Sequence, residues 1–329
     1  MTNVHTSTSP SEPAGRDATP KDLLRVADLE PTALVDILEL ARRMKQDPLG
    51  WQDTLRGGAV GCVFEKPSTR TRVSLAVAAH RLGMTAVLLS REEMQLGHGE
   101  SVADTARVLS SYLDAVTVRT HGHDVVEELA DHASIPVVNA LSNTHHPCQS
   151  LADLLALTEH FGSLRGLTAA FVGDARGNTC NSFTEACAAT GMHLNIAHPP
   201  GYDPDPDVLA RARATMRTTG GSVNVVIEPA EAVRGARAVY AEVWVPMDRK
   251  NESALRARVF ASYRVDRELL AHADAEATVL HCLPAVRGEE ITSDVLDGPR
   301  CLAWRQAANR LPTSQAVLHT LVTGSRARG

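Results

Sequence analysis

The sequence lacks several features that would place it in a familiar class of protein. No apolar run approaches the roughly 20 residues that cross a bilayer, so a membrane-spanning helix is not expected. Acidic residues outnumber basic ones, 39 to 33, and the formal net charge is −6, which argues against binding nucleic acid through its phosphates. Residues 1–20 resemble neither a signal peptide with its apolar core nor an arginine-rich transit peptide.

Paired cysteines of the CxxC type are also missing, although six cysteines occur at positions 62, 148, 180, 187, 282 and 301. Scattered cysteines in a chain of 329 residues indicate reduced thiols, and neither a disulfide framework nor a zinc site. We therefore expect a soluble cytoplasmic enzyme or binder of small molecules. Residues 1–20, rich in Ser, Thr and Pro, are expected to form a disordered tail.

The sequence does contain a regular alternation of β-branched runs and helical stretches. The first runs are AVGCVF (59–64), TAVLLS (85–90), AVTVRT (115–120) and PVVNAL (136–141). Helical periodicity follows them near 70–82, 101–113 and 124–133, and again near 147–161. A second set of runs comprises LTAAFVGD, HLNIAHP, VNVVIE, AVYAEVWV and TVLHCL. This alternation predicts the α/β class, with two doubly wound parallel-sheet domains joined by helices and a C-terminal helix near 314–324.

The chain length also favours two domains. We expect the first domain at residues 21–147 and the second at residues 148–308. Residues 309–329 are expected to form a helix that packs back on the first domain. In open sheets of this kind, ligands bind beyond the carboxyl ends of the strands, and nearly every polar cluster of this sequence lies at such an end.

The first polar cluster is KPSTRTR, which follows the run AVGCVF. Because Pro67 ends the strand and helical periodicity begins near Thr69, we expect the cluster at a helix N-terminus, whose free N–H groups and dipole attract an anion. Hydroxyl groups and forked guanidiniums add contacts suited to phosphate. The alternative is a plain Ser/Thr cap followed by solvated arginines. Two arginines and three hydroxyls within one turn favour the anion site.

Four further clusters are ambiguous when each is considered alone. Arg119 leaves a strand in VRTHGH, where a surface arginine is the common case. The segment HHPCQ places His146 and Gln149 three residues apart, so both can face one point, although a histidine before a helix is usually a cap. Cys282 in LHCLP would ordinarily be a buried thiol. Arg310 in RQAANRL is expected just before the terminal helix and would ordinarily be solvated.

Together and in this order, STRTR, HPCQ and HCLP resemble the ornithine branch of the aspartate/ornithine carbamoyltransferase family, across the chain from about residue 20. Aspartate-type members carry a segment like HPLPR where this chain has HCLPA, so Cys282 points to the ornithine branch. The resemblance implies transfer of the carbamoyl group of carbamoyl phosphate to the side-chain amine of ornithine or a related diamino acid. Phosphate would be released, and ornithine would give citrulline. Residues 21–147 would then bind carbamoyl phosphate and residues 148–308 the acceptor.

The resemblance also implies roles for individual residues. Those expected to hold the phosphate are Ser68, Thr69, Arg70 and Thr71. Those expected to hold the carbamoyl group are Arg119, His146 and Gln149, with the pocket completed by Arg310 and by the backbone of Cys282 and Leu283. In REEMQLGHGES, Gln95 matches a loop residue that the family donates to the neighbouring subunit's site. The assembly would then be a homotrimer or a multiple of trimers.

The implied reaction needs no metal and no organic cofactor, because the phosphate leaving group is already activated. A neutral amine attacks the carbamoyl carbon, an oxyanion forms, and phosphate leaves. Arg119, His146 and Thr71 would stabilise the oxyanion, and Cys282 lies where the family places a residue beside the attacking amine. An amine with a resting pKa near about 10 must lose a proton, so activity should favour alkaline pH.

The acceptor half departs from the family pattern, whereas the donor half does not. This chain has EVWVPMD where ornithine enzymes carry DVWVSMG, so Glu replaces Asp, Pro replaces Ser, and Asp248 replaces Gly. A DLYHP-like segment is here NTHHP, and a GDGNN-like loop has become GDARGN, one residue longer. Positions expected to face the acceptor are Asn178, which can match the carboxylate-binding asparagine, Glu242, Pro246, Met247 and Thr144.

Three functions therefore stay open at the level of sequence. The leading one is a carbamoyltransferase for ornithine or a closely related diamino acid. The second is a paralogue for another amine, such as 2,3-diaminopropionate, 2,4-diaminobutyrate, lysine or an acylated ornithine. The third is a non-catalytic regulator that binds carbamoyl phosphate or another anion. Phosphate release in the presence of any amine would exclude the third.

Overall fold

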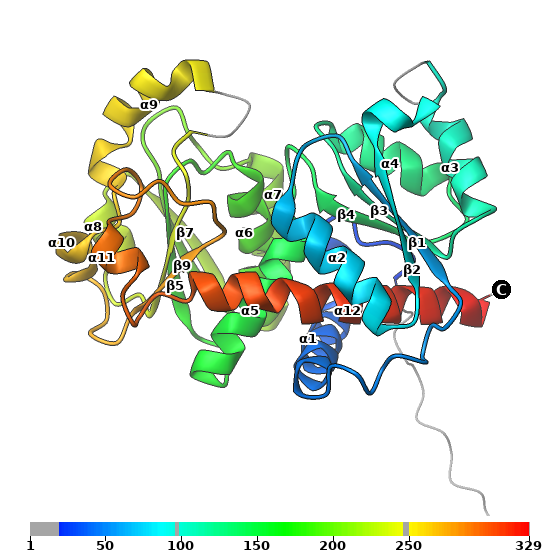
Figure 1. The fold of residues 1–329 in the computed structure, drawn as a ribbon. Helices are drawn as coiled ribbons and strands as arrows, with labels where there is room; N and C mark the ends of the chain where they lie inside the picture. The colour runs from blue at the N-terminus through cyan, green and yellow to red at the C-terminus, as the bar shows by residue number, and fades with distance from the viewer. Residues whose placement is uncertain (1–19, 96–98, 246–249, 329) are drawn as a thin grey trace, which may run out of the picture.

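The computed structural model describes residues 20–95, 99–245 and 250–328. Two β-sheets lie in the two lobes visible in Figure 1. The first sheet has the order β2-β1-β3-β4, with β1 Ala59–Phe64, β2 Thr85–Ser90, β3 Ala115–Arg119 and β4 Val137–Leu141. The second has the order β7-β6-β5-β8-β9, with β5 Thr168–Val172, β6 His193–Ala197, β7 Ser222–Val226, β8 Ala238–Ala241 and β9 Thr278–His281. The strand pairs within both sheets are parallel, which confirms the predicted fold class.

Helices connect the successive strands, as parallel pairing requires. In the first lobe they are α1 Pro31–Gln46, α2 Thr69–Arg81, α3 Val102–Ser110 and α4 His123–His132. They continue with α5 Pro147–Phe161, α6 Asn178–Thr190, α7 Pro206–Thr219, α8 Pro229–Val233, α9 Ser253–Val259, α10 Arg267–Leu270, α11 Ser293–Leu296 and α12 Ala303–Arg328. Short 3-10 turns are η1 Val26–Asp28, η2 Arg91–Glu93, η4 Lys250–Glu252 and η5 Ala261–Tyr263.

Both sheets are doubly wound, so each has a point where the strand order reverses. The first sheet grows from β1 to β2 on one side and to β3 on the other, and the second grows from β5 to β6 and to β8. Ligands bind at such points, beyond the carboxyl ends of the strands. The sequence places candidate residues at or after five of these ends: Ser68 after β1, Arg119 on β3, Asn178 after β5, Glu242 after β8 and Cys282 after β9.

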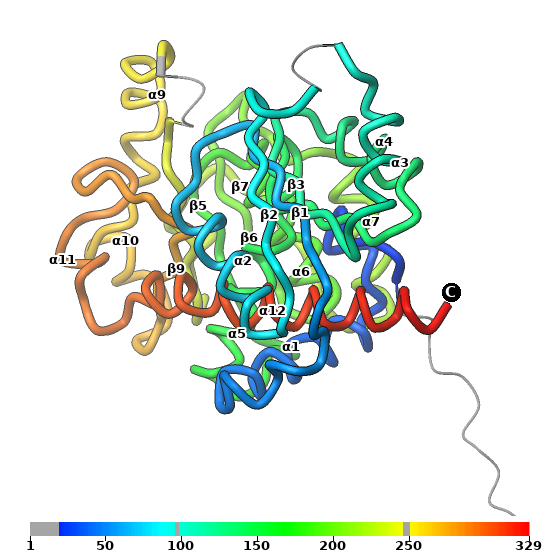
Figure 2. Tube along the Cα trace, turned by 45° about the vertical axis from the view of Figure 1, so that its right-hand side comes forward, coloured from blue at the N-terminus to red at the C-terminus, as the bar shows by residue number. Residues whose placement is uncertain are grey.

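The terminal helix α12 is longer than the helix predicted near 314–324. It begins at Ala303, so Arg310 lies inside the helix and not before it, and Pro312 occupies an interior turn. Proline usually marks a helix boundary because it lacks an N–H group and crowds the preceding turn. Here α12 runs along the base of both lobes in Figures 1 and 2 and packs on α1, α2 and α5. Burial of its side chains, Pro312 included, offsets the local cost.

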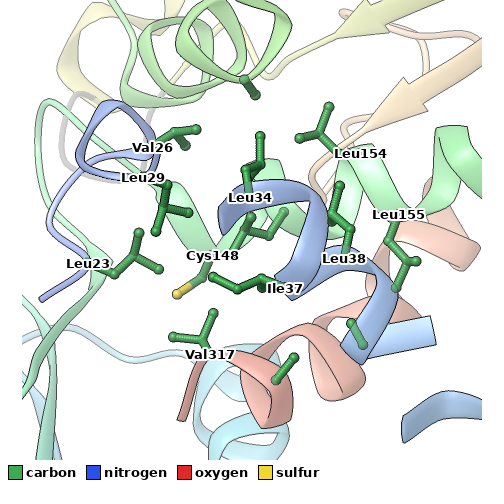
Figure 3. Packing of buried hydrophobic residues seen from close by; sticks show 14 of the residues in the cluster. Leu23, Val26, Leu29, Leu34, Ile37, Leu38, Cys148, Leu154, Leu155 and Val317 are labelled. Carbon is green, nitrogen blue, oxygen red and sulfur yellow. The ribbon is translucent and has the colours of Figure 1, made fainter. Parts of the chain in front are cut away.

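Hydrophobic packing joins the two lobes beneath the sheets. Figure 3 shows Ile37 and Leu38 of α1 close to Leu154 and Leu155 of α5, with Val317 of α12 beside them. All five side chains are buried, and their cluster continues into the apolar residues of β1 and β5. The three helices thus form a shared core that holds the two sheets side by side.

Candidate active site

A pocket of about 330 Å³ opens between the carboxyl ends of the two sheets. Twelve of the residues singled out from the sequence line it together. They are Ser68, Thr69, Arg70, Thr71, Arg119, His146, Gln149, Asn178, Glu242, Cys282, Leu283 and Arg310. Segments far apart in the sequence therefore converge on one cavity that draws side chains from both lobes.

Two other candidate residues, Gln95 and Thr144, are described by the structure and do not line this pocket. Gln95 is exposed and lies beyond β2, after η2. Thr144 lies just outside the lining, where its backbone oxygen accepts a hydrogen bond from Asn181. Pro246 and Met247 fall outside the described residues.

The N-terminus of α2 faces the pocket. Ser68 caps the helix, because its Oγ accepts a hydrogen bond from the Thr71 backbone N–H at 3.4 Å. The helix has 13 residues, so its dipole and the N–H groups of its first turn favour an anion at this end. Arg70 donates through Nη2 to the backbone oxygen of Leu283, which links α2 to the segment after β9.

Two guanidiniums meet at the Thr71 hydroxyl. Arg119 Nη1 and Arg310 Nη2 donate to Thr71 Oγ1 at 3.4 and 3.3 Å. The Nε atoms of both arginines are buried without a hydrogen-bond partner in the described parts of the chain. Burial, followed by the charges of Arg310 and Arg70, lowers the pKa of Arg119 to about 10, and burial lowers the pKa of Arg310. Buried positive charge and unpaired donors both favour an anionic ligand.

His146 and Gln149 reach Arg310 from the start of α5. Arg310 Nη1 donates to Gln149 Oε1 at 2.8 Å and lies 3.4 Å from His146 Nε2. Burial and the neighbouring guanidiniums hold the pKa of His146 well below its usual 6.5, so the imidazole is neutral. Its buried Nδ1 has no hydrogen-bond partner among the described residues. A neutral imidazole can donate a hydrogen bond to a ligand without adding charge.

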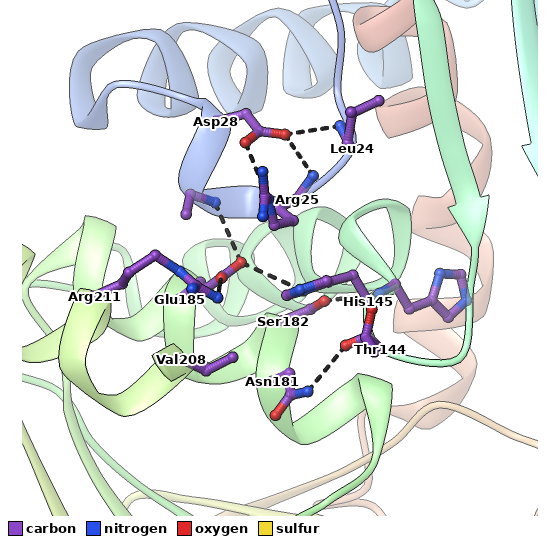
Figure 4. Close-up of polar contacts among 12 residues, drawn as sticks. Leu24, Arg25, Asp28, Thr144, His145, Asn181, Ser182, Glu185, Val208 and Arg211 are labelled. Carbon is purple, nitrogen blue, oxygen red and sulfur yellow. Dashed lines mark hydrogen bonds and ion pairs between the residues drawn. The ribbon is translucent and has the colours of Figure 1, made fainter. Parts of the chain in front are cut away.

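Side chains of α6 hold the segment from which His146 enters the pocket (Figure 4). Asn181 Nδ2 donates to the backbone oxygen of Thr144 at 3.0 Å. The backbone N–H of His146 donates to Ser182 Oγ at 2.7 Å. Helix α5 then begins with Pro147, whose missing N–H is harmless in the first turn. These contacts fix the backbone on both sides of residue 145 and hence the position of the His146 imidazole.

The second lobe contributes a carboxyl and a thiol. Burial, followed by the charges of Asp174 and Asp153, raises the pKa of Glu242 to about 8. Its Oε2 is buried without a hydrogen-bond partner among the described residues. Burial, followed by Glu242, also raises the pKa of the Cys282 thiol. A ligand with a cationic group would stabilise the ionised Glu242 in this part of the pocket.

Asn178 begins α6 at the same side of the pocket. Its Nδ2 donates to the backbone oxygen of Ser142 at 2.6 Å, which leaves a second N–H on the same nitrogen for a ligand. Its Oδ1 accepts from the Thr179 hydroxyl at 3.3 Å. The amide is therefore oriented by protein contacts on both of its ends.

Sequence reasoning missed part of the lining. Thr179, Leu141 and Pro284 line the pocket, and so does Pro67, which we had used only as the residue that ends the strand. Thr179 could have been found, because it follows Asn178 in the first turn of the same helix. Leu141 carries no such signal, since an apolar residue at the end of β4 is ordinary for a buried strand.

The described residues contain neither a cluster of metal-binding side chains nor a membrane-spanning helix. In residues 20–95, 99–245 and 250–328, no group of three or more His, Cys, Asp or Glu side chains could hold a metal ion. None of the helices in the same ranges combines the length and the apolar character needed to span a membrane.

Comparisons with known proteins agree with the geometry of the pocket. The profile of the aspartate/ornithine carbamoyltransferase carbamoyl-P binding domain matches residues 21–159, and that of the Asp/Orn binding domain matches residues 165–321. An ornithine carbamoyltransferase from Methanoculleus marisnigri is 46% identical over 309 residues, covering 93% of this chain and 98% of that protein. Another, from Acidothermus cellulolyticus, is 48% identical over 302 residues, covering 92% and 96%.

Solved structures extend the likeness to three dimensions. Ornithine carbamoyltransferase from Pyrococcus furiosus superposes with a TM-score of 0.89 at 40% identity, covering 93% of this chain and 98% of that one. The enzyme from Gloeobacter violaceus gives a TM-score of 0.84 at 42% identity, covering 93% and 100%. By sequence over both domains and by fold, the chain belongs to the aspartate/ornithine carbamoyltransferase family.

Proposed function

We propose that this protein transfers the carbamoyl group of carbamoyl phosphate to the side-chain amine of ornithine, forming citrulline and phosphate. The observation that carries the proposal is the convergence of Arg70, Arg119 and Arg310 on one pocket at the N-terminus of α2. Buried guanidinium nitrogens that have no partner within the described parts of the chain favour a small, strongly anionic ligand. The relatives described above, all named ornithine carbamoyltransferases, favour ornithine as the acceptor.

In this proposal, the first lobe binds the donor. The cap of α2 and the Arg70 fork hold the phosphate, with Ser68, Thr69 and Thr71 supplying hydroxyls. Arg119 and the neutral His146 donate to the carbamoyl oxygen. Gln149 Oε1 and the backbone oxygen of Leu283 accept from the carbamoyl nitrogen, since carbonyl oxygens can only accept. Each contact uses a donor or acceptor that already lines the pocket.

The chemical step then follows from these positions. The acceptor's neutral amine attacks the carbamoyl carbon, and the carbonyl electrons move onto oxygen. Arg119, His146 and Thr71 stabilise the resulting oxyanion, and donors fixed in advance cost no reorganisation. The C–O bond to phosphate breaks as the carbonyl re-forms, the attacking nitrogen gives a proton to the departing phosphate, and phosphate leaves toward Arg70 and the α2 terminus. Cys282 lies beside the attacking amine as a neutral thiol.

The second lobe, by the same proposal, binds the acceptor. Glu242 attracts the acceptor's α-ammonium group, and the Asn178 amide donates to its carboxylate. One specific observation favours a second candidate, in which the acceptor is another diamino acid. Glu242 is one methylene longer than the family's aspartate, and its carboxyl lies near the α6 N-terminus, where a Cβ added at Gly177 would meet Oε2 at 3.3 Å. A shorter acceptor would fit a carboxyl that extends further into the pocket.

We also propose that the active assembly is a homotrimer or a multiple of trimers. The edge strand β2 is unusual for an α/β sheet, because Val87 and Leu88 are 37% and 41% exposed. On the first lobe, Val73 of α2 and Tyr112, just after α3, are more exposed still. Exposed apolar side chains of this kind are typical of surfaces that associate. Gln95 lies just beyond β2, so association there would bring it near another chain.

The proposed reaction is tested by following phosphate release from carbamoyl phosphate with and without ornithine. We expect release to depend on ornithine and to match the citrulline formed, mole for mole. Release that is no faster than spontaneous decomposition would reject the proposal. Binding of carbamoyl phosphate without any acceptor-dependent release would instead support the non-catalytic regulator.

A further inference from the structure

Asp153 of α5 is fully buried next to the pocket and accepts hydrogen bonds from three elements. Its Oδ1 accepts from Gln149 Nε2 and from Gln306 Nε2, each at 2.7 Å. Its Oδ2 accepts from the Tyr240 hydroxyl at 3.1 Å. The donors lie on α5, α12 and β8, yet Asp153 itself is not among the residues that line the cavity.

Gln149 stands between Asp153 and the cavity, and its two amide ends have different partners. Nε2 donates to Asp153, whereas Oε1 accepts from Arg310 Nη1 at 2.8 Å. Turning the amide by half a rotation would point its NH2 group at a guanidinium, which can only donate. The amide oxygen would then face a carboxylate, which only accepts. Both contacts would become repulsive, so Asp153 and Arg310 together permit one orientation of the amide.

Gln306 extends the same network to the segment after β9. Its Oε1 accepts from the His281 backbone N–H at 2.9 Å, and His281 Nδ1 accepts from the Leu283 backbone N–H at 2.9 Å. The backbone oxygen of Leu283 is the acceptor of Arg70. The Asp153 carboxyl is therefore connected by hydrogen bonds to Gln149, directly, and to the Leu283 backbone, through Gln306 and His281. The oxygens of Gln149 and Leu283 are the two that we assign to the carbamoyl part of the pocket.

We propose that Asp153 is a positioning residue that orients the Gln149 amide, so that the Gln149 oxygen accepts from the NH2 group of carbamoyl phosphate. The inference rests on the function proposed above. One lone pair of Oε1 accepts from Arg310, and the second is left for the carbamoyl nitrogen. Without Asp153 only the Arg310 contact still opposes rotation of the amide, and a turned amide would point its NH2 group at the NH2 group of the substrate.

The role requires a hydrogen-bond acceptor and does not require a charge, which makes two substitutions informative. Asp153→Asn keeps an oxygen for both glutamines and turns its NH2 toward the Tyr240 hydroxyl, which can also accept. We expect kcat/KM for carbamoyl phosphate to fall by less than about tenfold. Asp153→Leu removes the acceptor, and we expect a loss of at least about 100-fold, the scale of misplacing a substrate-positioning group.

Tyr240→Phe is the matched control, because it removes a hydrogen bond from the same carboxyl without touching Gln149. We expect its melting temperature to fall while kcat/KM stays within about threefold of wild type. In Asp153→Leu, the KM for carbamoyl phosphate should rise more than the KM for the acceptor. A merely structural role would instead lower activity in proportion to the loss of melting temperature in all three variants.

The outcomes separate this inference from the proposed function. A wild-type enzyme without ornithine-dependent citrulline formation would reject the function itself. With an active wild type, a folded Asp153→Leu variant of normal kcat/KM would overturn the positioning role alone. A folded Asp153→Asn variant that loses more than about tenfold would also overturn it, because charge would then be required. If Asp153→Leu does not fold, the Asp153→Asn result decides.

Discussion

At the scale of single residues, we expect the proposed donor site to depend on the shape of its guanidiniums as well as on their charge. Arg70 lines the cavity and donates to the Leu283 oxygen with one of its nitrogens. Arg119 and Arg310 share the Thr71 hydroxyl, and their Nε atoms have no hydrogen-bond partner among the residues that the structure describes. A planar fork makes two parallel hydrogen bonds to phosphate, which an ammonium group cannot reproduce.

Replacing Arg70 by lysine keeps the charge and removes the fork. We expect kcat/KM to fall by at least about 100-fold, the scale of losing one strong transition-state contact. Arg72→Lys is the matched control, since Arg72 is exposed and stacks on the Phe64 ring at 5.1 Å. It should change kcat/KM by less than about threefold. Near-wild-type kinetics for Arg70→Lys would remove the phosphate assignment.

Ionisation of Glu242 should make kcat/KM for the acceptor fall on the acidic side of its pH profile. Its pKa is raised to about 8, so the carboxyl is mostly protonated at neutral pH and gains its charge as the pH rises. Because the ionised form attracts the acceptor's α-ammonium, kcat/KM for the acceptor should increase through about pH 8. Glu242→Gln should lower kcat/KM and shift the remaining limb toward the ordinary amine pKa near about 10. Identical profiles for both proteins would exclude this role.

At the scale of elements, the strands and the presence of a terminal helix were predictable, but the start of that helix was not. Short β-branched runs bounded by turn residues predicted all nine described strands, and α5 has the predicted limits. The predicted start of the last helix was too late, because the packing of α12 on α1, α2 and α5 is not visible in its local sequence. Likewise, the Asp153 network joins α5, α12 and β8, and no local motif brings those residues together.

A second buried carboxyl, Glu185, joins the elements that hold the His146 segment (Figure 4). Its Oε2 accepts from the Ala27 backbone N–H near η1 at 3.3 Å and lies 3.8 Å from His145 Nδ1. Its Oε1 accepts from Arg211 of α7 at 3.5 Å. Burial raises the pKa of Glu185 to about 7, while burial lowers that of His145 to about 3, so the histidine is neutral.

This raised pKa predicts how stability depends on pH. A carboxyl whose folded pKa lies above its unfolded value of 4.5 favours folding when protonated. Its contribution to the free energy of unfolding is present below about pH 4.5 and is lost as the pH rises through about 7. The loss amounts to about 3 kcal/mol. Glu185→Gln should abolish this pH dependence, so the free energy of unfolding of the variant should rise relative to that of wild type as the pH increases from about 4.5 to about 7. Urea unfolding across that range checks it, and parallel curves for the two proteins would contradict it.

At the scale of the whole molecule, the residues proposed to bind donor and acceptor come from both lobes and line one pocket. Gln95 differs from them, since it is exposed beyond β2 and does not line its own chain's cavity. The proposed trimer would bring it to a neighbouring chain. The family resemblance supplied this assignment, because a residue shared between chains leaves no pattern in the spacing of one sequence.

Mixing two inactive variants tests the shared site. Gln95→Ala removes the residue donated to the neighbour, and Arg119→Ala removes one from the chain's own pocket. Hybrid assemblies contain some sites with both residues intact, so we expect activity to return after the subunits exchange. Each variant incubated alone provides the control. An absence of recovery, once exchange is verified by native mass spectrometry, would count against a site built from two chains.

The most direct test of the central claim is a competition among acceptors. Wild-type protein is given carbamoyl phosphate with equal concentrations of ornithine, 2,4-diaminobutyrate, 2,3-diaminopropionate, lysine and putrescine, and the carbamoylated products are quantified by mass spectrometry. We expect citrulline to exceed every other product by more than about tenfold, as a selective acceptor site requires. Predominance of another carbamoylated amine would contradict ornithine as the substrate, and the absence of any carbamoylated product would contradict carbamoyl transfer itself.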